Sequence, residues 1–322
     1  MLPPYNRPFL SFADQVTLLS SRGLAVTDAW RAGRHLQRIG YYRLKDYWFP
    51  FRETRTTIDA QGRPVQETLE TFRAGTRFED AVALYVFDKR LRLVMMDVIE
   101  RIEIALRVDI AHTLGARDLW AHRAPGFLDP KRSVSPTRTG TRHGDWLARS
   151  DAAEARSRAE WVRAYRGSYS SPLPVVMAVE TWEFGTLSHL VGMLHPSDRV
   201  SISRKYAIPR PEMLESWMRA IAGVRNTCAH HGRLWNHPLV DQPSLPTAAE
   251  MPSLGHLRVY NATQTRLYAV AAVCAHLLSV MQPASQWRTR MRDLWHQFPA
   301  IPGINPAQAG FMPTWRTLPL WR

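Results

Sequence analysis

The stretch SWMRAIAGVRNTCAHHGRLWN, residues 216–236, carries the clearest pattern in this chain of 322 residues. Five apolar side chains in this stretch and just before it recur at spacings of three and four, which indicates an amphipathic helix. The apolar stripe consists of Leu214, Trp217, Ile221, Val224 and Cys228. Asn226 and His230 lie one turn apart and nearly opposite this stripe, and Arg225 lies at its edge. We therefore expect Arg225, Asn226 and His230 to converge on a surface that the local core does not use.

An arginine beside a histidine suits the cleavage of RNA. The guanidinium fork holds a phosphate by two hydrogen bonds and offsets negative charge in the transition state. A histidine exchanges protons near neutral pH, so it can serve the 2′-hydroxyl or the leaving oxygen. Attack by the 2′-hydroxyl needs no metal and leaves a 2′,3′-cyclic phosphate. One His230 supplies half of an acid–base pair, so two copies of the motif in a dimer would supply both halves.

The residues around this helix also predict a helical protein. The strongest further helix runs from about Phe78 to Leu114, because its apolar residues step by three and four until Gly115 provides a stop. Polar residues 52–77 predict a loop or a hairpin. The Pro-rich tail, residues 298–322, is expected to be extended. Other helices are predicted at residues 12–22, 27–39, 175–194, 197–206, 211–231 and 255–282, with Thr27 or Asp28 as the N-cap of the second.

The charge of the chain points to a polyanionic partner. Its 42 Lys and Arg against 28 Asp and Glu give a net charge of +14, and only four of the 42 are lysines. Residues 131–166 hold nine basic and four acidic residues, 9 − 4 = +5. Nucleic acid or an acidic membrane surface would account for this balance. A genome rich in arginine codons is the alternative explanation.

Other sequence features favour a cytoplasmic protein. The N-terminus lacks the apolar core of a signal peptide, and the longest nearly apolar stretch, residues 267–281, is too short to span a bilayer. Cys228 and Cys274 make neither a disulfide framework nor a zinc-binding pair. We expect two reduced cysteines, no metal site, no cofactor and no membrane anchor.

Several blocks together resemble a known family. They are GYYRLKDYW at 40–48, LYVFDKRLR at 84–92, ERIEIALR at 100–107, EFGTLS at 183–188 and the motif stretch at 225–236, with GFMPTW at 310–315 in the tail. In this order they resemble the Abi-like (AbiD/AbiF) abortive infection proteins. The pattern of Arg225, Asn226 and His230 resembles the R-x(4–6)-H signature of the HEPN superfamily. That signature alone is weak, whereas the set of blocks is specific.

The resemblance implies a fold and a function. It implies an all-α, HEPN-like helical bundle with an N-terminal helical extension and an extended C-terminal tail. We expect an extension at 1–77, a helical domain at 78–297 with a basic insert at about 116–170, and the tail at 298–322, together forming one compact unit. The implied activity is binding or cleavage of RNA in phage defence or as a toxin. Implied partners are a second copy of the chain, a regulatory noncoding RNA and an antitoxin.

Two alternatives to a nuclease remain open. The first is a scaffold that binds a structured RNA without cutting it, with Arg225 clamping a phosphate and His230 capping the helix. The second is a nucleotide-binding partner of a nucleotidyltransferase, which the positive charge fits less well.

Further residues are candidates for supporting roles. Glu103 and Arg107 form either a helix salt bridge or a pair that orients Arg225 or His230, and His231 is a possible second acid–base group. In the aromatic block, base stacking by Tyr42, Tyr47 and Trp48 competes with core packing, and packing is the favoured interpretation. The predicted RNA contacts are Tyr42, Arg43, Lys45, Arg138, Arg142, Arg156, Arg158, Arg163, Arg233, Trp235 and Asn236.

Overall fold

The computed structural model describes residues 4, 6, 8–170, 172–259 and 261–322, without the side chains of residues 261 and 262. It divides the chain into two compact units. The first runs up to Arg90 and includes Gln297–Asn305, and the second comprises Leu91–His296 and Pro306–Arg322. The expected single unit, with boundaries at 77/78 and 297/298, is therefore replaced by two units that divide inside a helix.

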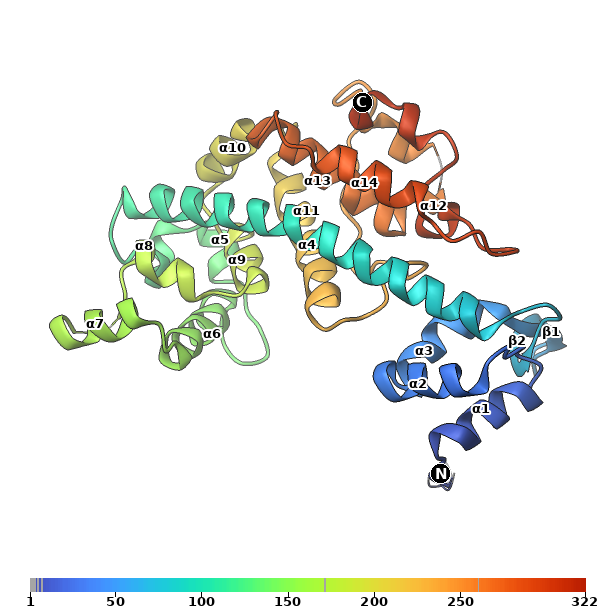
Figure 1. The fold of residues 1–322 in the computed structure, drawn as a ribbon. Helices are drawn as coiled ribbons and strands as arrows, with labels where there is room; N and C mark the ends of the chain where they lie inside the picture. Colours follow the sequence, from blue (N-terminus) through green and yellow to red (C-terminus); the bar gives the residue numbers. More distant parts are fainter. Residues whose placement is uncertain (1–3, 5, 7, 171, 260) are drawn as a thin grey trace. The chain divides into compact units, whose positions relative to one another are not determined.

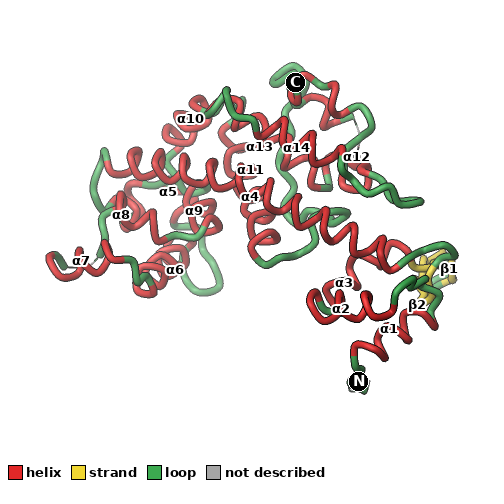
Figure 2. The backbone as a smooth tube through the Cα atoms, viewed as in Figure 1, coloured by secondary structure: helices red, strands yellow, loops and turns green. Residues whose placement is uncertain are grey.

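The first unit contains short helices and one hairpin (Figures 1 and 2). Asp28 caps the second helix by accepting a hydrogen bond from the Arg31 N–H at 2.8 Å, as one of the two predicted caps. Residues 52–72 form an antiparallel hairpin in which Thr56 pairs with Gln66. The elements are α1 (Phe12–Ser21), α2 (Ala29–Ile39), α3 (Tyr41–Trp48), β1 (Arg52–Ile58), β2 (Pro64–Phe72) and the first part of α4 (Phe78–Gly115).

The boundary lies inside α4 because the first turns of this helix pack within the first unit. Buried Tyr47 of α3 donates a hydrogen bond to Asp88 of α4 at 2.7 Å. The ring of Phe87 meets Phe298 edge-on at 4.9 Å, which brings the start of the tail to the same unit. Helix periodicity predicted the length of α4 but carries no information about which partner each turn packs against.

The second unit is helical and is organised around α11, which packs against α9, α10 and α13. Helix α13 is buried along most of its length, and Cys228 of α11 and Cys274 of α13 are both buried. This mostly α-helical architecture confirms the predicted fold class. Its elements after α4 are α5 (Pro130–Ser133), α6 (Arg142–Arg156), α7 (Glu160–Ser168), α8 (Val175–Ala178), α9 (Phe184–Val191), α10 (Pro196–Lys205), α11 (Pro211–Ala229), α12 (Asn261–Gln264), α13 (Leu267–Met281) and α14 (Trp287–His296).

Two predicted helices are interrupted in this unit. The segment predicted as a helix over 175–194 divides into α8 and α9, because Trp182 and Glu183 between them are extended. The predicted helix over 255–282 becomes a helix only at Leu267, preceded by short turns. Apolar periodicity persists across such breaks, so it did not reveal them.

The tail is not extended along the surface, which corrects that part of the prediction. Residues from Pro306 onward form three short 3₁₀ turns, and the aromatic side chains between them are buried. Trp321 donates a hydrogen bond from its indole N–H to the hydroxyl of Tyr268 at 3.0 Å. Burying Phe311, Trp315 and Trp321 removes a large apolar area from water, which outweighs the extended preference of the prolines.

No helix in the described part of the chain is both long enough and apolar enough to cross a membrane.

Candidate functional site

Helix α11 divides the motif between a buried face and an exposed face. The five residues of the predicted apolar stripe, from Leu214 to Cys228, are all buried. Asn226 and His230 are exposed and Arg225 is partly buried, as the helical wheel predicted. The core contacts of one face therefore fix the direction in which the polar residues of the other face project.

The end of α11 is a tight cap that positions the two histidines. His230 follows the last helical residue, and His231 has a φ of 57°, in the left-handed region. The N–H of His231 donates to the carbonyl of Cys228 at 3.0 Å, and that of Gly232 donates to Thr227 at 2.8 Å. This pair of bonds is a Schellman motif, which satisfies the last carbonyls of the helix. The chain turns sharply directly after His230.

Helix α4 holds the loop after this cap. Arg92, a largely buried residue of α4, donates from Nη1 to the carbonyl oxygen of Gly232 at 3.1 Å. Arg92 belongs to the block LYVFDKRLR at 84–92 that carries part of the family resemblance. Nothing in the sequence indicated that Arg92 contacts Gly232.

Helix α4 also faces Arg225. The Nε of Arg225 lies 4.0 Å from Oε2 of Glu103, and its Nη1 donates to Oδ1 of Asn226 at 3.3 Å. Glu103 accepts a hydrogen bond from Arg107 one turn along α4. The helix salt bridge and the contact with Arg225 therefore coexist, so the two interpretations of Glu103 are compatible.

Arg107 is anchored on its other side as well. It donates to the carbonyl oxygens of Val179 at 2.8 Å and Trp182 at 2.7 Å, in the break between α8 and α9. These contacts leave its guanidinium little freedom. Arg107 thereby holds the Glu103 carboxylate in place beside Arg225.

An open pocket of about 310 Å³ lies beside Arg225, Glu103 and Arg107. Its remaining lining residues are Met96, Ile99, Glu100, Ile104 and Glu180. Within the described residues, no group of three His, Cys, Asp or Glu side chains is arranged to hold a metal ion. The pocket thus offers two guanidinium groups beside three carboxylates.

The imidazole of His230 is exposed and makes no hydrogen bond or ion pair within the described part of the chain. It lies one turn from Asn226 on the same face of α11. The ring is therefore accessible to a ligand that approaches Arg225 along this face.

A family model described as Abi-like protein matches residues 34–236, more than half of the chain. The chain belongs to the Abi-like protein family. This membership points to abortive infection, that is, to defence against bacteriophage. No curated protein and no solved structure matches the chain.

The residues after the motif of this Abi-like protein differ in accessibility. Trp235 is 0% exposed, so it cannot stack on a base, and its predicted RNA contact is wrong. Its neighbour Leu234 is also buried, and the pair anchors the loop in the core. Arg233 and Asn236 are partly exposed, and Arg233 approaches the carbonyl of Asn236 at 3.5 Å. The sequence left burial of Trp235 open as one of two interpretations.

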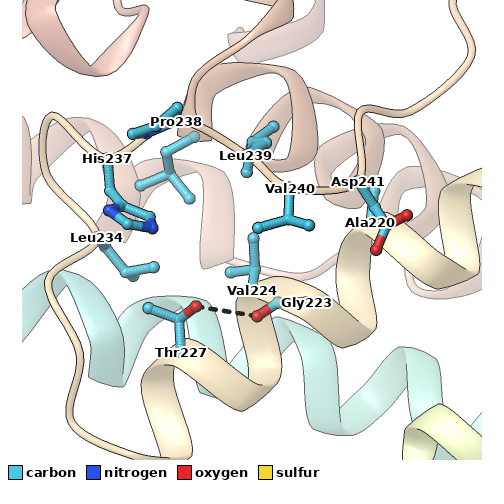
Figure 3. A pocket seen from close by; sticks show the side chains of 11 residues that line it. Ala220, Gly223, Val224, Thr227, Leu234, His237, Pro238, Leu239, Val240 and Asp241 are labelled. Atoms are coloured by element: carbon cyan, nitrogen blue, oxygen red, sulfur yellow. Dashed lines mark hydrogen bonds between the residues drawn. The ribbon is translucent and has the colours of Figure 1, made fainter. Parts of the chain in front are cut away.

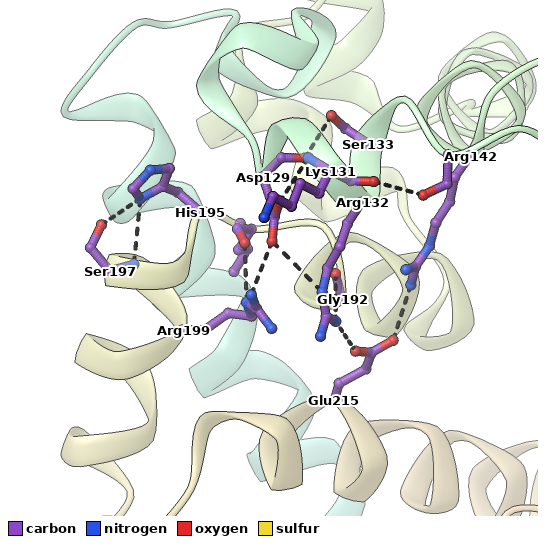
Figure 4. A network of polar contacts seen from close by, with 12 residues as sticks. Asp129, Lys131, Arg132, Ser133, Arg142, Gly192, His195, Ser197, Arg199 and Glu215 are labelled. Atoms are coloured by element: carbon purple, nitrogen blue, oxygen red, sulfur yellow. Dashed lines mark hydrogen bonds and ion pairs between the residues drawn. The ribbon is translucent and has the colours of Figure 1, made fainter.

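The arginines predicted as RNA contacts also differ from one another. Arg142 forms an ion pair with Glu215 at 3.0 Å, and Arg132 binds the other oxygen of the same carboxylate at 2.7 Å (Figure 4). Arg142 is thus engaged in linking α6 to α11. Arg156 approaches Glu183 at 3.8 Å on the surface. Arg138, Arg158 and Arg163 are exposed.

The aromatic block of this Abi-like protein forms α3 in the first unit. Tyr47 and Trp48 are fully buried, which agrees with the favoured packing interpretation. Tyr42 is 69% exposed, and the Lys45 ammonium lies 5.9 Å from its ring centroid. Arg43 is also exposed. Tyr42, Arg43 and Lys45 therefore remain candidate RNA contacts of that unit.

A small pocket adjoins the side of α11 that carries Thr227 (Figure 3). It is lined mainly by apolar side chains, together with His237 and Asp241, and has a volume of about 50 Å³. The Thr227 hydroxyl donates back to the carbonyl of Gly223 at 3.0 Å. Such a volume accommodates a few water molecules and is too small for a nucleobase.

Proposed function

We propose that this Abi-like protein is an RNA-binding, metal-independent endoribonuclease of the HEPN type that acts in abortive infection or as a toxin. The observation that supports this most is the exposure of Asn226 and His230 on one face of α11, next to the partly exposed Arg225. The contact from Glu103, held by Arg107, gives the Arg225 guanidinium a defined orientation. A guanidinium can hold the scissile phosphate, and an accessible imidazole can carry out one of the two proton transfers in cleavage by a 2′-hydroxyl.

The proposed reaction is an internal transfer of the phosphoryl group. Arg225 holds the scissile phosphate by its guanidinium fork. The 2′-hydroxyl loses its proton to a general base and attacks phosphorus, and the bond to the 5′-oxygen of the next nucleotide breaks. That oxygen takes up a proton from a general acid. The products are a 2′,3′-cyclic phosphate and a 5′-hydroxyl, and His230 fills one of the two proton-transfer roles.

A second copy of the chain would supply the other proton-transfer group. Helix α4 supports this part of the proposal, because three apolar side chains are solvent-exposed on one of its faces, and one of them, Ile104, lines the Arg225 pocket. They are Leu93, Ile104 and Val108, at 63%, 54% and 47% exposure. Ile104 and Val108 lie one turn apart, and exposed apolar side chains grouped on one helix face are typical of an interface between proteins. Further proposed partners are a regulatory noncoding RNA and an antitoxin.

A non-catalytic RNA scaffold is the second candidate. It is favoured by three exposed arginines outside the motif helix: Arg138 before α6, Arg158 between α6 and α7, and Arg163 in α7. In this function Arg225 would clamp a phosphate and His230 would only terminate α11.

Substitution of the motif histidine separates the two candidates. We expect His230→Ala to abolish RNA cleavage and growth arrest while the helical circular-dichroism spectrum stays unchanged, because the side chain is exposed and its cap bonds are made by the backbone. The matched control is His112→Ala, an exposed histidine of α4 outside the motif. The assay uses purified protein and labelled RNA and tests the products for cyclic-phosphate ends. Cleavage at the wild-type rate by the purified His230→Ala protein would refute the nuclease proposal, whereas RNA binding without cleavage by the wild type would favour the scaffold.

A further inference from the structure

A second group of basic residues lies where three helices of the second unit meet. Trp146 of α6 donates from its indole N–H to the carbonyl of Thr186 of α9 at 2.9 Å. The ion pair between Arg142 and Glu215 connects α6 to α11 directly beside Gly192, at the end of α9. Helices α6, α9 and α11 are therefore held in fixed relation to one another.

Three basic side chains lie one or two helical turns from this ion pair, one on each of the three helices. Arg219 follows Glu215 by one turn on α11, His189 precedes Gly192 by one turn on α9, and Arg149 follows Arg142 by two turns on α6. All three are exposed. We refer to Arg149, His189 and Arg219 as the three-helix basic cluster.

The cluster carries an excess of positive charge. The pKa of His189 is lowered first by close packing of part of the ring against protein, and then by the charges of Arg149, Arg142 and Arg219. Glu215 is the acid that opposes this effect, and its carboxylate already binds Arg132 and Arg142 (Figure 4). The influence of several guanidinium groups on one imidazole indicates that they lie near it.

Asp145 of α6 and Asp129 beside Arg132 have other hydrogen-bond partners. Asp145, one turn before Arg149 on α6, accepts a hydrogen bond from the Thr139 hydroxyl at 2.6 Å, which lowers its pKa, and the charge of Arg149 lowers it to a smaller extent. Asp129 binds Arg199 at 3.1 Å (Figure 4). Arg149 and Arg219 make no hydrogen bond or ion pair with any residue that the structure describes. Their guanidinium groups are available to an anion.

The cluster is aligned with the motif along α11. Arg219, Gly223, Asn226 and His230 lie on the same exposed face of this helix, because their spacings are four, three and four. Two helical turns, about 10 Å, separate the backbone of Arg219 from that of Asn226. Gly223 between them carries no side chain that would obstruct a strand lying along the face.

We propose that Arg149, His189 and Arg219 form a second phosphate-binding subsite, which holds the backbone of a single-stranded RNA a few nucleotides from the phosphate at Arg225. This inference rests on the proposed function, because it assigns a direction along α11 to the RNA that the proposed nuclease binds. A guanidinium group can bind a phosphate by two parallel hydrogen bonds. A phosphate between Arg149 and Arg219 would also offset the repulsion between their two positive charges. The subsite fixes which stretch of the strand lies over His230.

The test removes two charges from the cluster and compares them with two charges removed elsewhere. The variant is Arg149→Gln/Arg219→Gln, and the matched control is Arg31→Gln/Arg38→Gln, which removes two exposed arginines of α2. The affinity for a fluorescent single-stranded RNA with 2′-O-methyl riboses, which cannot be cleaved, is measured over a range of salt concentrations. For each lost phosphate contact, the dependence of log K on log salt becomes shallower by about 0.7.

We expect the cluster variant to bind about tenfold more weakly, with a shallower salt dependence, while the control binds like the wild type. Equal affinities and equal salt slopes in all three proteins would overturn the inference. If the wild type cleaves unmodified RNA and all three proteins have equal affinities and salt slopes, the nuclease proposal is supported and the subsite is refuted. If the wild type binds RNA without cleaving it and the cluster variant binds RNA more weakly, the subsite is supported and the nuclease proposal is refuted. Absence of RNA binding by the wild type refutes both.

The titration of His189 provides a second measurement that does not depend on cleavage. A phosphate beside the ring favours its charged form, so the same uncleavable RNA must raise the pKa of His189, followed by its imidazole NMR signals. His112, exposed on α4, serves as the internal reference. An unchanged His189 titration in RNA-saturated protein would contradict the subsite.

Discussion

Arg225 is the residue at which orientation and charge act in opposite directions. The Glu103 carboxylate 4.0 Å from its Nε holds the guanidinium in place, but it also repels a phosphate that approaches the same group. Arg107 neutralises part of that carboxylate and ties it to the carbonyls of Val179 and Trp182. In the proposed nuclease, Glu103 is therefore a positioning residue.

This opposition predicts a split between binding and catalysis. We expect Glu103→Gln to bind uncleavable RNA about fivefold more tightly, since one partly exposed charge contact is worth up to ~1 kcal/mol. The same variant should cleave more slowly at saturating RNA, because Arg225 loses its orienting charge. Binding and single-turnover cleavage are measured on the same preparation.

The control for this residue is Glu100→Gln, which removes a carboxylate from the same pocket without an ion pair to Arg225. It should tighten binding without slowing cleavage. A Glu103→Gln protein that binds RNA more weakly than the wild type would contradict the positioning role.

Among the elements, α4 serves two surfaces at once. One side of it contacts the motif helix and its loop through Glu103 and Arg92. Leu93 and Ile104 are eleven residues apart, so they share a solvent-exposed face of the helix. A dimer that covered this face would place the second copy beside the Arg225 pocket.

We expect Leu93→Lys/Ile104→Lys to convert the proposed dimer into a monomer and to reduce cleavage strongly, since each site would lose the group that the other copy supplies. Charges buried in an interface cost several kcal/mol unless they are paired. Molar mass from light scattering and RNA cleavage are measured together. Val240→Lys, at another exposed apolar position, is the control and should leave the mass unchanged. A wild-type protein that is active as a monomer would exclude the composite site.

At the scale of the whole molecule, a buried histidine links stability to pH. His122 is fully buried against Trp146 and Trp182, and within the described residues neither of its ring nitrogens has a hydrogen-bond partner. Burial lowers its pKa to about 4, and the charge of Arg123 adds to this effect. The folded protein thus binds fewer protons than the unfolded chain between the usual value of 6.5 and about 4.

Folding stability should therefore fall as the pH falls from about 6.5 to about 4, and the contribution of His122 to this loss is about 3 kcal/mol. His122→Phe keeps an aromatic ring and removes the titrating group, so its stability should decline less over this interval. Urea unfolding at a series of pH values measures the difference. A His122→Phe curve parallel to that of the wild type would refute the assignment.

The parts of the fold that depend on the spacing of nearby residues were predictable from the sequence. The 3.6-residue period identified the buried face of α11 and the length of α4, and the capping preference of Asp28 identified the start of α2. Whether residues 52–77 form a loop or a hairpin was left open, because polar residues satisfy both. The interruption before Leu267 was missed because apolar spacing continues through it.

For the candidate site, the sequence by itself determined the residue types and the common face of Asn226 and His230 on α11. Only the tertiary structure decided what surrounds them: the approach of Glu103 to Arg225, the clamp from Arg92, and the pairing of Arg142 with Glu215. It likewise decided that Trp235 is buried while Arg149 and Arg219 are exposed. The physical reason is range. Helix periodicity and capping act within a few residues, whereas charge pairing and burial depend on residues far apart in the sequence that only the folded chain brings together.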